Sequence, residues 1–214
     1  MTDPELRECE IEAELESEFP ALRVLYVEVS ARSGRSPASV HERLKVMSNR
    51  FTGPKAVQLR QEPIPWAYRV FFRQVGIDPD ERRTPVEQLA LDRMRAGGFR
   101  SRNLLDDAIA IATVETGVPI VAFDAERLTG TLRLRLSQPG ELMGRAGRPL
   151  SANQIVIADD ERAVGVLFAD LDPDRGVTPK TERMLLCAVQ VEGVPDIAVE
   201  EALWTATEIL VGAA

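Results

Sequence analysis

The sequence is poor in histidine, cysteine and aromatic residues. It contains one histidine, His41, and two cysteines, Cys9 and Cys187, in 214 residues, and aromatic residues make up 5%. The cysteines are far apart and match no zinc or redox spacing, so we expect no metal site and no cofactor built on them. Free cysteines suit a reducing compartment, and the acidic start lacks the basic-then-apolar order of a secretory signal, so a cytoplasmic location is expected.

Long apolar runs are also missing. No stretch approaches the roughly 18 uncharged apolar residues of a membrane-spanning helix, so we expect no membrane partner. The length of 214 residues and the hydrophobic content of 44% are sufficient for one sizeable core.

Positive charge is scarce. The chain has 26 Lys and Arg against 34 Asp and Glu, a formal charge of −8. Because non-specific binding to nucleic acid depends on cations that release condensed counterions, we expect no DNA partner, and RNA contact only at a local basic patch. One such patch is present in "LDRMRAGGFRSRN", where Arg93, Arg95, Arg100 and Arg102 face a single Asp92.

Hydrophobic periodicity, together with the positions of Gly and Pro, predicts mainly helices in the first half of the chain, mainly strands in the second half and a helix at the C-terminal end. Thr84 and Asn103 are expected to cap helices, and Gly97 and Gly117 to end them. Residues 4–18 are acidic and predict no definite element. The expected fold class is α+β, a mixed β-sheet packed with helices in a single compact domain over residues 1–214. Helices are predicted over 37–51, 85–98, 104–116 and 195–212, and strands over 21–30, 131–136, 154–158, 162–169 and 183–193. In 60–76 prolines forbid a regular start, and a short helical pattern follows them and ends at Gly76.

Three sequence features suggest chemistry but are better explained by ordinary structure. His41 lies between charged neighbours on a helix and predicts a solvated side chain rather than part of a Ser-His-Asp triad. Acidic residues alternate over 170–174 as in a calcium loop, but Arg175 and Thr181 occupy the positions that need Gly and a bidentate Glu. We therefore expect a solvated turn there. "GRAGRP", residues 144–149, precedes no helix that could hold a phosphate and predicts a hairpin turn.

The stretch "ETGVPIVAFDAERLTG", residues 115–130, combines a Gly-Val-Pro turn, a small apolar wall and Asp124. With "YRVFFRQVGIDPDERRTPVEQL", "SRNLLDD", "NQIVIADDERAVGV" and "VTPKTERMLLCAV", it resembles the B3/B4 domain of the phenylalanyl-tRNA synthetase beta subunit, and more closely the freestanding proteins built from that domain alone. The resemblance covers residues 68–191, and residues 1–60 match loosely. Leu136 replaces an alanine of the family pattern. No aminoacylation domain fits in this length, so a full synthetase is not expected.

In the synthetase this domain resembles a proofreading module that binds the 3′ end of mischarged tRNA and hydrolyses the ester. The resemblance implies a pocket for the amino-acid side chain, built by the helix at 103–116, the turn at 117–124 and the strand around Cys187. Ala110, Val121 and Cys187 stand where the synthetase has Asn, His and Glu, so no catalytic residue is assigned. The implied pocket residues are Asn103, Asp107, Ala110, Gly117, Pro119, Val121, Ala122, Phe123, Asp124 and Cys187.

The leading hypothesis is a freestanding tRNA-editing-like domain that binds the aminoacylated 3′ end of tRNA, and its amino-acid moiety, and deacylates a mischarged species in trans. The alternative is a non-catalytic protein that keeps the pocket for a small amino-acid-like ligand or a protein partner. A third reading, a structural domain without ligand, requires side chains to fill the pocket. Because Ala110 and Val121 are apolar, we expect small apolar aminoacyl groups to be preferred over tyrosyl groups.

Overall fold

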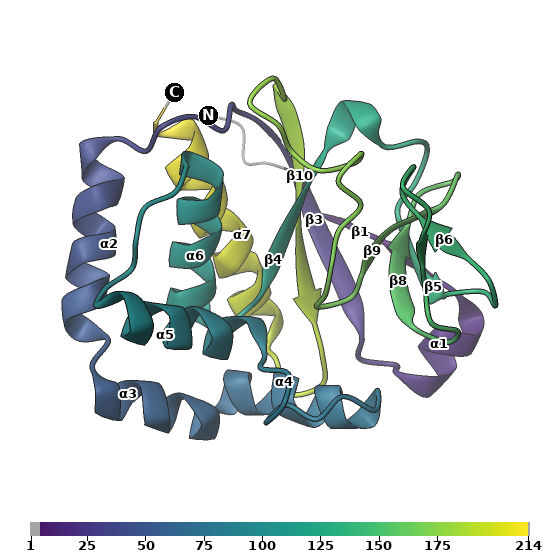
Figure 1. The fold of residues 1–214 in the computed structure, drawn as a ribbon, viewed down its shortest axis with the longest axis horizontal. Coiled ribbons are helices and arrows are strands. Elements are labelled where there is room, and N and C mark those ends of the chain that lie inside the picture. The colour runs from purple at the N-terminus through teal and green to yellow at the C-terminus, as the bar shows by residue number, and fades with distance from the viewer. Residues whose placement is uncertain (1–4, 214) are drawn as a thin grey trace.

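The computed structural model describes residues 5–213, which form two four-stranded sheets, a small hairpin and a layer of helices (Figure 1). Sheet A has the strand order β1-β3-β10-β4 and is antiparallel. Its strands are β1 (Arg7–Glu8), β3 (Arg23–Ser30), β10 (Arg183–Gln190) and β4 (Ile120–Asp124).

Sheet B has the order β2-β5-β8-β9 and is mixed, because β2 pairs with β5 in parallel and the other pairs are antiparallel. The predicted hairpin at 144–149 is confirmed by pairing of β6 with β7. The remaining strands are β2 (Glu10–Ile11), β5 (Arg133–Leu136), β6 (Leu142–Met143), β7 (Arg148–Pro149), β8 (Ile155–Ala158) and β9 (Ala163–Val166).

Sheet A lies between the helical layer and sheet B (Figure 1). Helix α7 (Asp196–Val211) packs against β3 and β10, α6 (Leu104–Thr116) packs against α7, and α2 (Ala38–Arg50) lies outside α6. Three further helices, α3 (Gly53–Gln58), α4 (Pro63–Gln74) and α5 (Pro85–Ala96), lie along the lower side in the view of Figure 1. The arrangement confirms the expected α+β class.

The ends of the central helices follow the sequence signals. Thr84 and Glu87 form a capping box at the start of α5, and the Asn103 side chain accepts the Asp106 N–H at the start of α6. Gly97 ends α5 with φ 75° and Gly117 ends α6 with φ 79°, a backbone region that glycine adopts without a Cβ clash.

Other sequence expectations need correction. Residues 5–18 hold β1, β2 and the short helix α1 (Ala13–Glu18), because β1 and β2 are edge strands that pair with distant partners. The segment 117–124 is a turn only at its start, since Ile120–Asp124 form β4 against β10. Helix α3 was not expected.

One hydrophobic core joins sheet A, sheet B, α6 and α7. Tyr68 of α4 is fully buried, and its hydroxyl donates to the Val189 carbonyl at 2.5 Å, which ties α4 to the end of β10. Within residues 5–213, no helix is both long enough and apolar enough to cross a bilayer.

Candidate functional site: a groove between the layers

A groove of about 560 Å³ opens between α1, α4 and the adjacent part of sheet B. Its walls combine apolar and polar side chains and come from both layers, so it exists only when the layers are packed together. The apolar wall residues used below are Phe19, Phe71, Leu136, Ile155, Val166 and Phe168.

Charged side chains stand at the margin of this groove. Glu14 and Glu18 lie one helical turn apart on α1, and both are exposed. Neither carboxylate forms a hydrogen bond or ion pair with another residue in the described range 5–213. Arg82, from the connection between α4 and α5, donates through Nη2 to the Phe168 carbonyl at 2.8 Å. The groove therefore combines an apolar wall with carboxylates from one element and a guanidinium from another.

Phe168 closes the groove towards the core. Its φ of 57° lies in the left-handed region that side chains other than glycine rarely adopt. The ring centroid lies 5.8 Å from that of Tyr68, 6.0 Å from Phe71 and 5.2 Å from Phe72. These distances are typical of favourable aromatic pairs, so ring packing offsets the backbone strain.

The structure brings together two of the expected pocket residues, Val121 and Cys187. They are direct partners in the β4–β10 register, and Tyr26 of β3 is the next partner in the same row. Cys187 is fully buried, and burial raises the pKa of its thiol well above the usual value. Cys187 therefore packs inside sheet A rather than lining the open groove.

Ala110 lies elsewhere, in a second hollow of about 380 Å³ between α5 and the start of α6. Asp107 lines the same hollow but is itself buried. Its carboxylate accepts the hydroxyls of Ser36 and Ser101, each at 2.5 Å, and the Arg102 N–H at 2.9 Å. Asp107 therefore fastens two loops to α6, and Asn103 beside it caps that helix.

The other expected pocket residues hold the backbone around β4. The Pro119 carbonyl accepts the Val189 N–H, and Gly117 ends α6. Phe123 and Ala122 are buried on alternate sides of β4. Asp124 is buried and accepts the Thr181 hydroxyl at 2.5 Å.

The arginines of the basic patch divide into two groups. Arg93 donates to the Ser48 carbonyl at 2.8 Å, near the end of α2, and so has a structural contact. The other three are exposed, and we refer to them as the α5–α6 arginines. In the part of the chain that the structure describes, none of them has an ion-pair partner; they are Arg95, Arg100 and Arg102.

The remaining sequence candidates lie outside the groove. His41 is exposed as expected, with Nε2 3.1 Å from the Ser101 hydroxyl oxygen. The expectation of a solvated turn at 170–174 is wrong for Asp172, whose side chain is fully buried 2.9 Å from Arg162 Nη2. Among residues 5–213, no group of three His, Cys, Asp or Glu is arranged to hold a metal ion.

Sequence reasoning missed the groove altogether. Its walls come from segments between residues 14 and 168, and no local spacing signals their convergence. The nearest signal was Leu136, the departure from the family pattern, which does line the groove.

Comparison with known proteins agrees with this architecture. The family described as "B3/4 domain" matches residues 67–202. The phenylalanine–tRNA ligase beta subunit of Cutibacterium acnes is 30% identical over 105 residues, which is 48% of this chain and 12% of that protein. The beta subunit of Photorhabdus laumondii is 33% identical over 101 residues, 45% of this chain and 13% of that protein. The beta subunit of Methylococcus capsulatus is 36% identical over 94 residues, 42% of this chain and 12% of that protein. This chain thus spans only a small part of the length of these relatives. The family match falls on α4 to α7 and on strands β4 to β10, and it leaves out β1, β2 and β3. The chain belongs to the B3/4 domain family.

Proposed function

We propose that the protein binds the aminoacylated 3′ end of a tRNA, with the aminoacyl group in the groove between the layers. The observation that carries this proposal is an open groove with an apolar wall and carboxylates at its margin, in a chain of a family shared with a tRNA ligase subunit. A groove of this kind is the usual form of a small-ligand site in proteins.

The groove complements the three parts of an aminoacyl ester. The α-ammonium group would pair with Glu14 or Glu18, and an apolar side chain would pack on Phe19 and Val166. The neighbouring phosphate would approach Arg82, whose guanidinium is exposed. The α5–α6 arginines would contact more distant phosphates of the acceptor strand.

We further propose that the bound ester is hydrolysed in trans without a side-chain nucleophile. The described groove residues include neither His nor Cys, and Cys187 is buried. A water held by backbone N–H groups beside the terminal ribose hydroxyl would attack the ester carbonyl. One oxyanion donor contributes about 10²–10³ in rate, and a positioned side-chain base about 10²–10⁴, so we expect slower turnover than in a site with both.

A second candidate is a binding protein for a free amino acid. Arg82 and the α1 carboxylates favour it, because a zwitterion presents a carboxylate to the guanidinium and an ammonium to Glu14 or Glu18. In this case Arg82 would be essential for binding, whereas an aminoacyl ester has no free carboxylate.

The test is a deacylation screen with tRNAs charged with small aliphatic, aromatic and hydroxylated amino acids. We expect release of a small aliphatic group that depends on enzyme concentration, and loss of that release in Ala152→Trp, which places a large side chain in the groove from an exposed position. Leu142→Trp is the matched control, because Leu142 is already half exposed and lies outside the groove. Equal activity of both variants, or no release from any charged tRNA, would contradict the proposal, and binding of free amino acids alone would favour the second candidate.

A further inference from the structure

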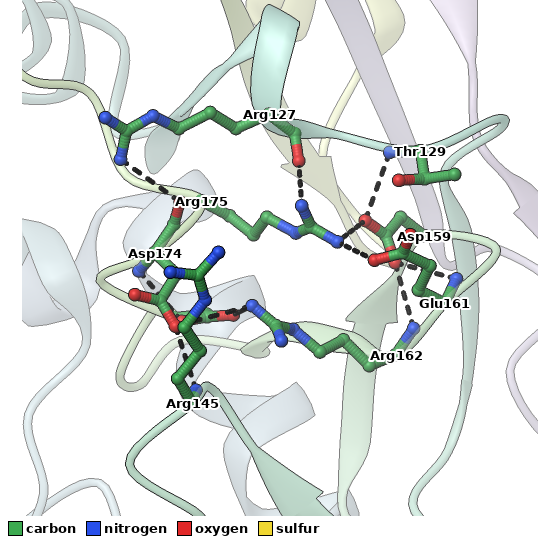
Figure 2. Close-up of polar contacts among 9 residues, drawn as sticks. Arg127, Thr129, Arg145, Asp159, Glu161, Arg162, Asp174 and Arg175 are labelled. Atoms are coloured by element: carbon green, nitrogen blue, oxygen red, sulfur yellow. Dashed lines mark hydrogen bonds and ion pairs between the residues drawn. The ribbon is translucent and has the colours of Figure 1, made fainter.

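Four arginines converge on a hollow of about 400 Å³, which is separate from the groove and from the α5–α6 arginines. Arg127 follows β4, Arg145 lies in the β6–β7 turn, Arg162 precedes β9, and Arg175 lies in the loop before β10. In Figure 2 the guanidinium group of Arg175 points to Asp159 and Glu161, and that of Arg162 points to Asp174. Carboxylates therefore already lie among these arginines, and an oxyanion ligand would take the place of the one that is most easily displaced.

Two of these arginines are held in place by buried carboxylates. Arg175 Nη2 lies 3.0 Å from Asp159 Oδ2, and the side chain of Asp159 is fully buried. Arg162 Nη2 lies 2.9 Å from the fully buried Asp172 and 3.4 Å from Asp174 Oδ2 (Figure 2). These ion pairs fix both guanidinium groups before any ligand arrives, so a ligand would lose little entropy in ordering them.

Several hydrogen-bond donors of the arginines around this hollow have no acceptor among the described residues. The Nε atoms of Arg162 and Arg175 are buried and have no acceptor within residues 5–213. The Arg145 guanidinium is exposed, and of this residue only the backbone N–H is bonded, to Asp174 Oδ2 at 2.8 Å. Asp159 has no spare capacity, because its oxygens already accept the N–H groups of Glu161 and Arg162, each at 2.9 Å, besides Arg175. Unmatched donors of this kind favour a ligand that only accepts.

One carboxylate already occupies part of this position. Glu161 pairs with Arg175 Nη2, although the Glu161 side chain is 56% exposed. An exposed carboxylate can leave at little cost, whereas the buried Asp159 cannot. Charge is neutralised within the Arg162–Asp172 and Arg175–Asp159 pairs, and Arg127 Nε lies 3.3 Å from Oδ2 of the buried Asp124. The charge of an incoming anion would therefore be balanced chiefly by Arg145.

We propose that this hollow binds a phosphate group. The phosphate displaces Glu161 from Arg175, and Arg145 contacts it from the side that faces solvent. Guanidinium groups pair with phosphate through two parallel hydrogen bonds, and four of them around one hollow suit its tetrahedral oxygens. The proposal does not depend on the groove, since the two share none of their lining residues.

The experiment is titration of the protein with inorganic phosphate at constant ionic strength, followed by calorimetry and by amide NMR shifts. We expect saturable binding with shifts at residues 127–129 and 161–162, about tenfold weaker binding in Arg145→Ala, and severalfold tighter binding in Glu161→Gln. Arg148→Ala is the matched control, because Arg148 is an exposed arginine of the same hairpin that pairs with Asp170 outside the hollow. Arg145→Ala removes only exposed atoms, so its melting temperature without phosphate should equal that of the unmodified protein.

A second arm uses the trinucleotide CCA, whose phosphates are diesters. Competition between CCA and inorganic phosphate would identify an RNA backbone as the source of the group, and binding of inorganic phosphate alone would identify a free or terminal phosphate. Absence of saturable binding in both arms, or equal weakening by Arg145→Ala and Arg148→Ala, would overturn the site. Unchanged affinity in Glu161→Gln would overturn the displacement of Glu161.

Discussion

Phe168 gives an unusually sharp test of the packing around the groove. Its backbone is left-handed at φ 57°, and its ring packs on Tyr68, Phe71 and Phe72. Two substitutions separate the two effects. Phe168→Ala removes the ring but keeps a Cβ in the strained region, whereas Phe168→Gly removes the ring and the strain together.

The magnitudes follow from burial and backbone conformation. Phe→Ala costs about 3–5 kcal/mol in a closed core, and because Phe168 is only partly buried we expect about 2–3 kcal/mol for Phe168→Ala. A left-handed backbone costs a residue with a Cβ about 1–2 kcal/mol, and glycine loses about 0.5–1 kcal/mol through the entropy of the unfolded chain. Phe168→Gly should therefore be about 0.5–1 kcal/mol more stable than Phe168→Ala.

The assay is urea unfolding followed by tryptophan fluorescence, with the free energy of unfolding compared between the two variants. Phe72 provides the control, since it belongs to the same aromatic cluster but lies inside α4. At position 72 glycine should be less stable than alanine by about 1 kcal/mol, the usual helical order. If alanine is also the more stable residue at position 168, ring packing does not hold a strained backbone there and the reasoning fails.

Three further predictions concern other parts of the molecule. Arg175→Met should lower the free energy of unfolding by about 3–5 kcal/mol, because it leaves the buried carboxylate of Asp159 without its cationic partner. Adding Asp159→Asn should recover part of this loss in urea unfolding, and no recovery would show that the two side chains are not coupled. Burial raises the pKa of Cys9 to about 12 and the pKa of Cys187 well above its usual range. Both thiols should therefore react slowly with iodoacetamide at pH 8 in the native protein and rapidly in urea, and fast alkylation of the native protein would contradict their burial. Replacing the α5–α6 arginines with Ala should flatten the slope of log K against log salt for single-stranded RNA by about 2, and an unchanged slope would exclude them as phosphate contacts.

The sequence was sufficient for those elements whose ends are set locally. Thr84, Asn103 and Gly117 act through hydrogen bonds and dihedral angles within a few residues of themselves, and the structure has each helix end where they indicate. β1 and β2 could not be predicted in this way, because two-residue strands carry no periodicity and exist only through pairing with β3 and β5. The segment of β4 was predicted to be part of a turn for a related reason, since its partner strand β10 comes some sixty residues later in the chain.

The groove was not predicted from the sequence, and the residues that the family resemblance assigned to one pocket lie in several places. Val121 and Cys187 are partners because β4 and β10 are neighbours in sheet A, but neither lines the groove. The apolar neighbours of Cys187 in the sequence do predict a buried thiol, and Cys187 is fully buried. The position of Ala110 in a different hollow could not be predicted, since it depends on how the helices pack. The buried Asp172 could not be predicted for the same reason, because an acidic loop predicts solvated side chains when the arginine that pairs with it is not known.

The most direct test of the central claim is a methyl NMR titration with a non-hydrolysable alanyl-adenosine analogue, in which an amide replaces the ester. We expect saturable shifts of the groove methyl groups of Leu136, Ile155 and Val166, and loss of these shifts in Ala152→Trp. We also expect weaker binding in Glu14→Gln with Glu18→Gln, which removes the partners of the ammonium group. If the analogue leaves these methyl resonances unmoved at saturation, or at the highest soluble concentration, the groove is not the site of the aminoacyl group.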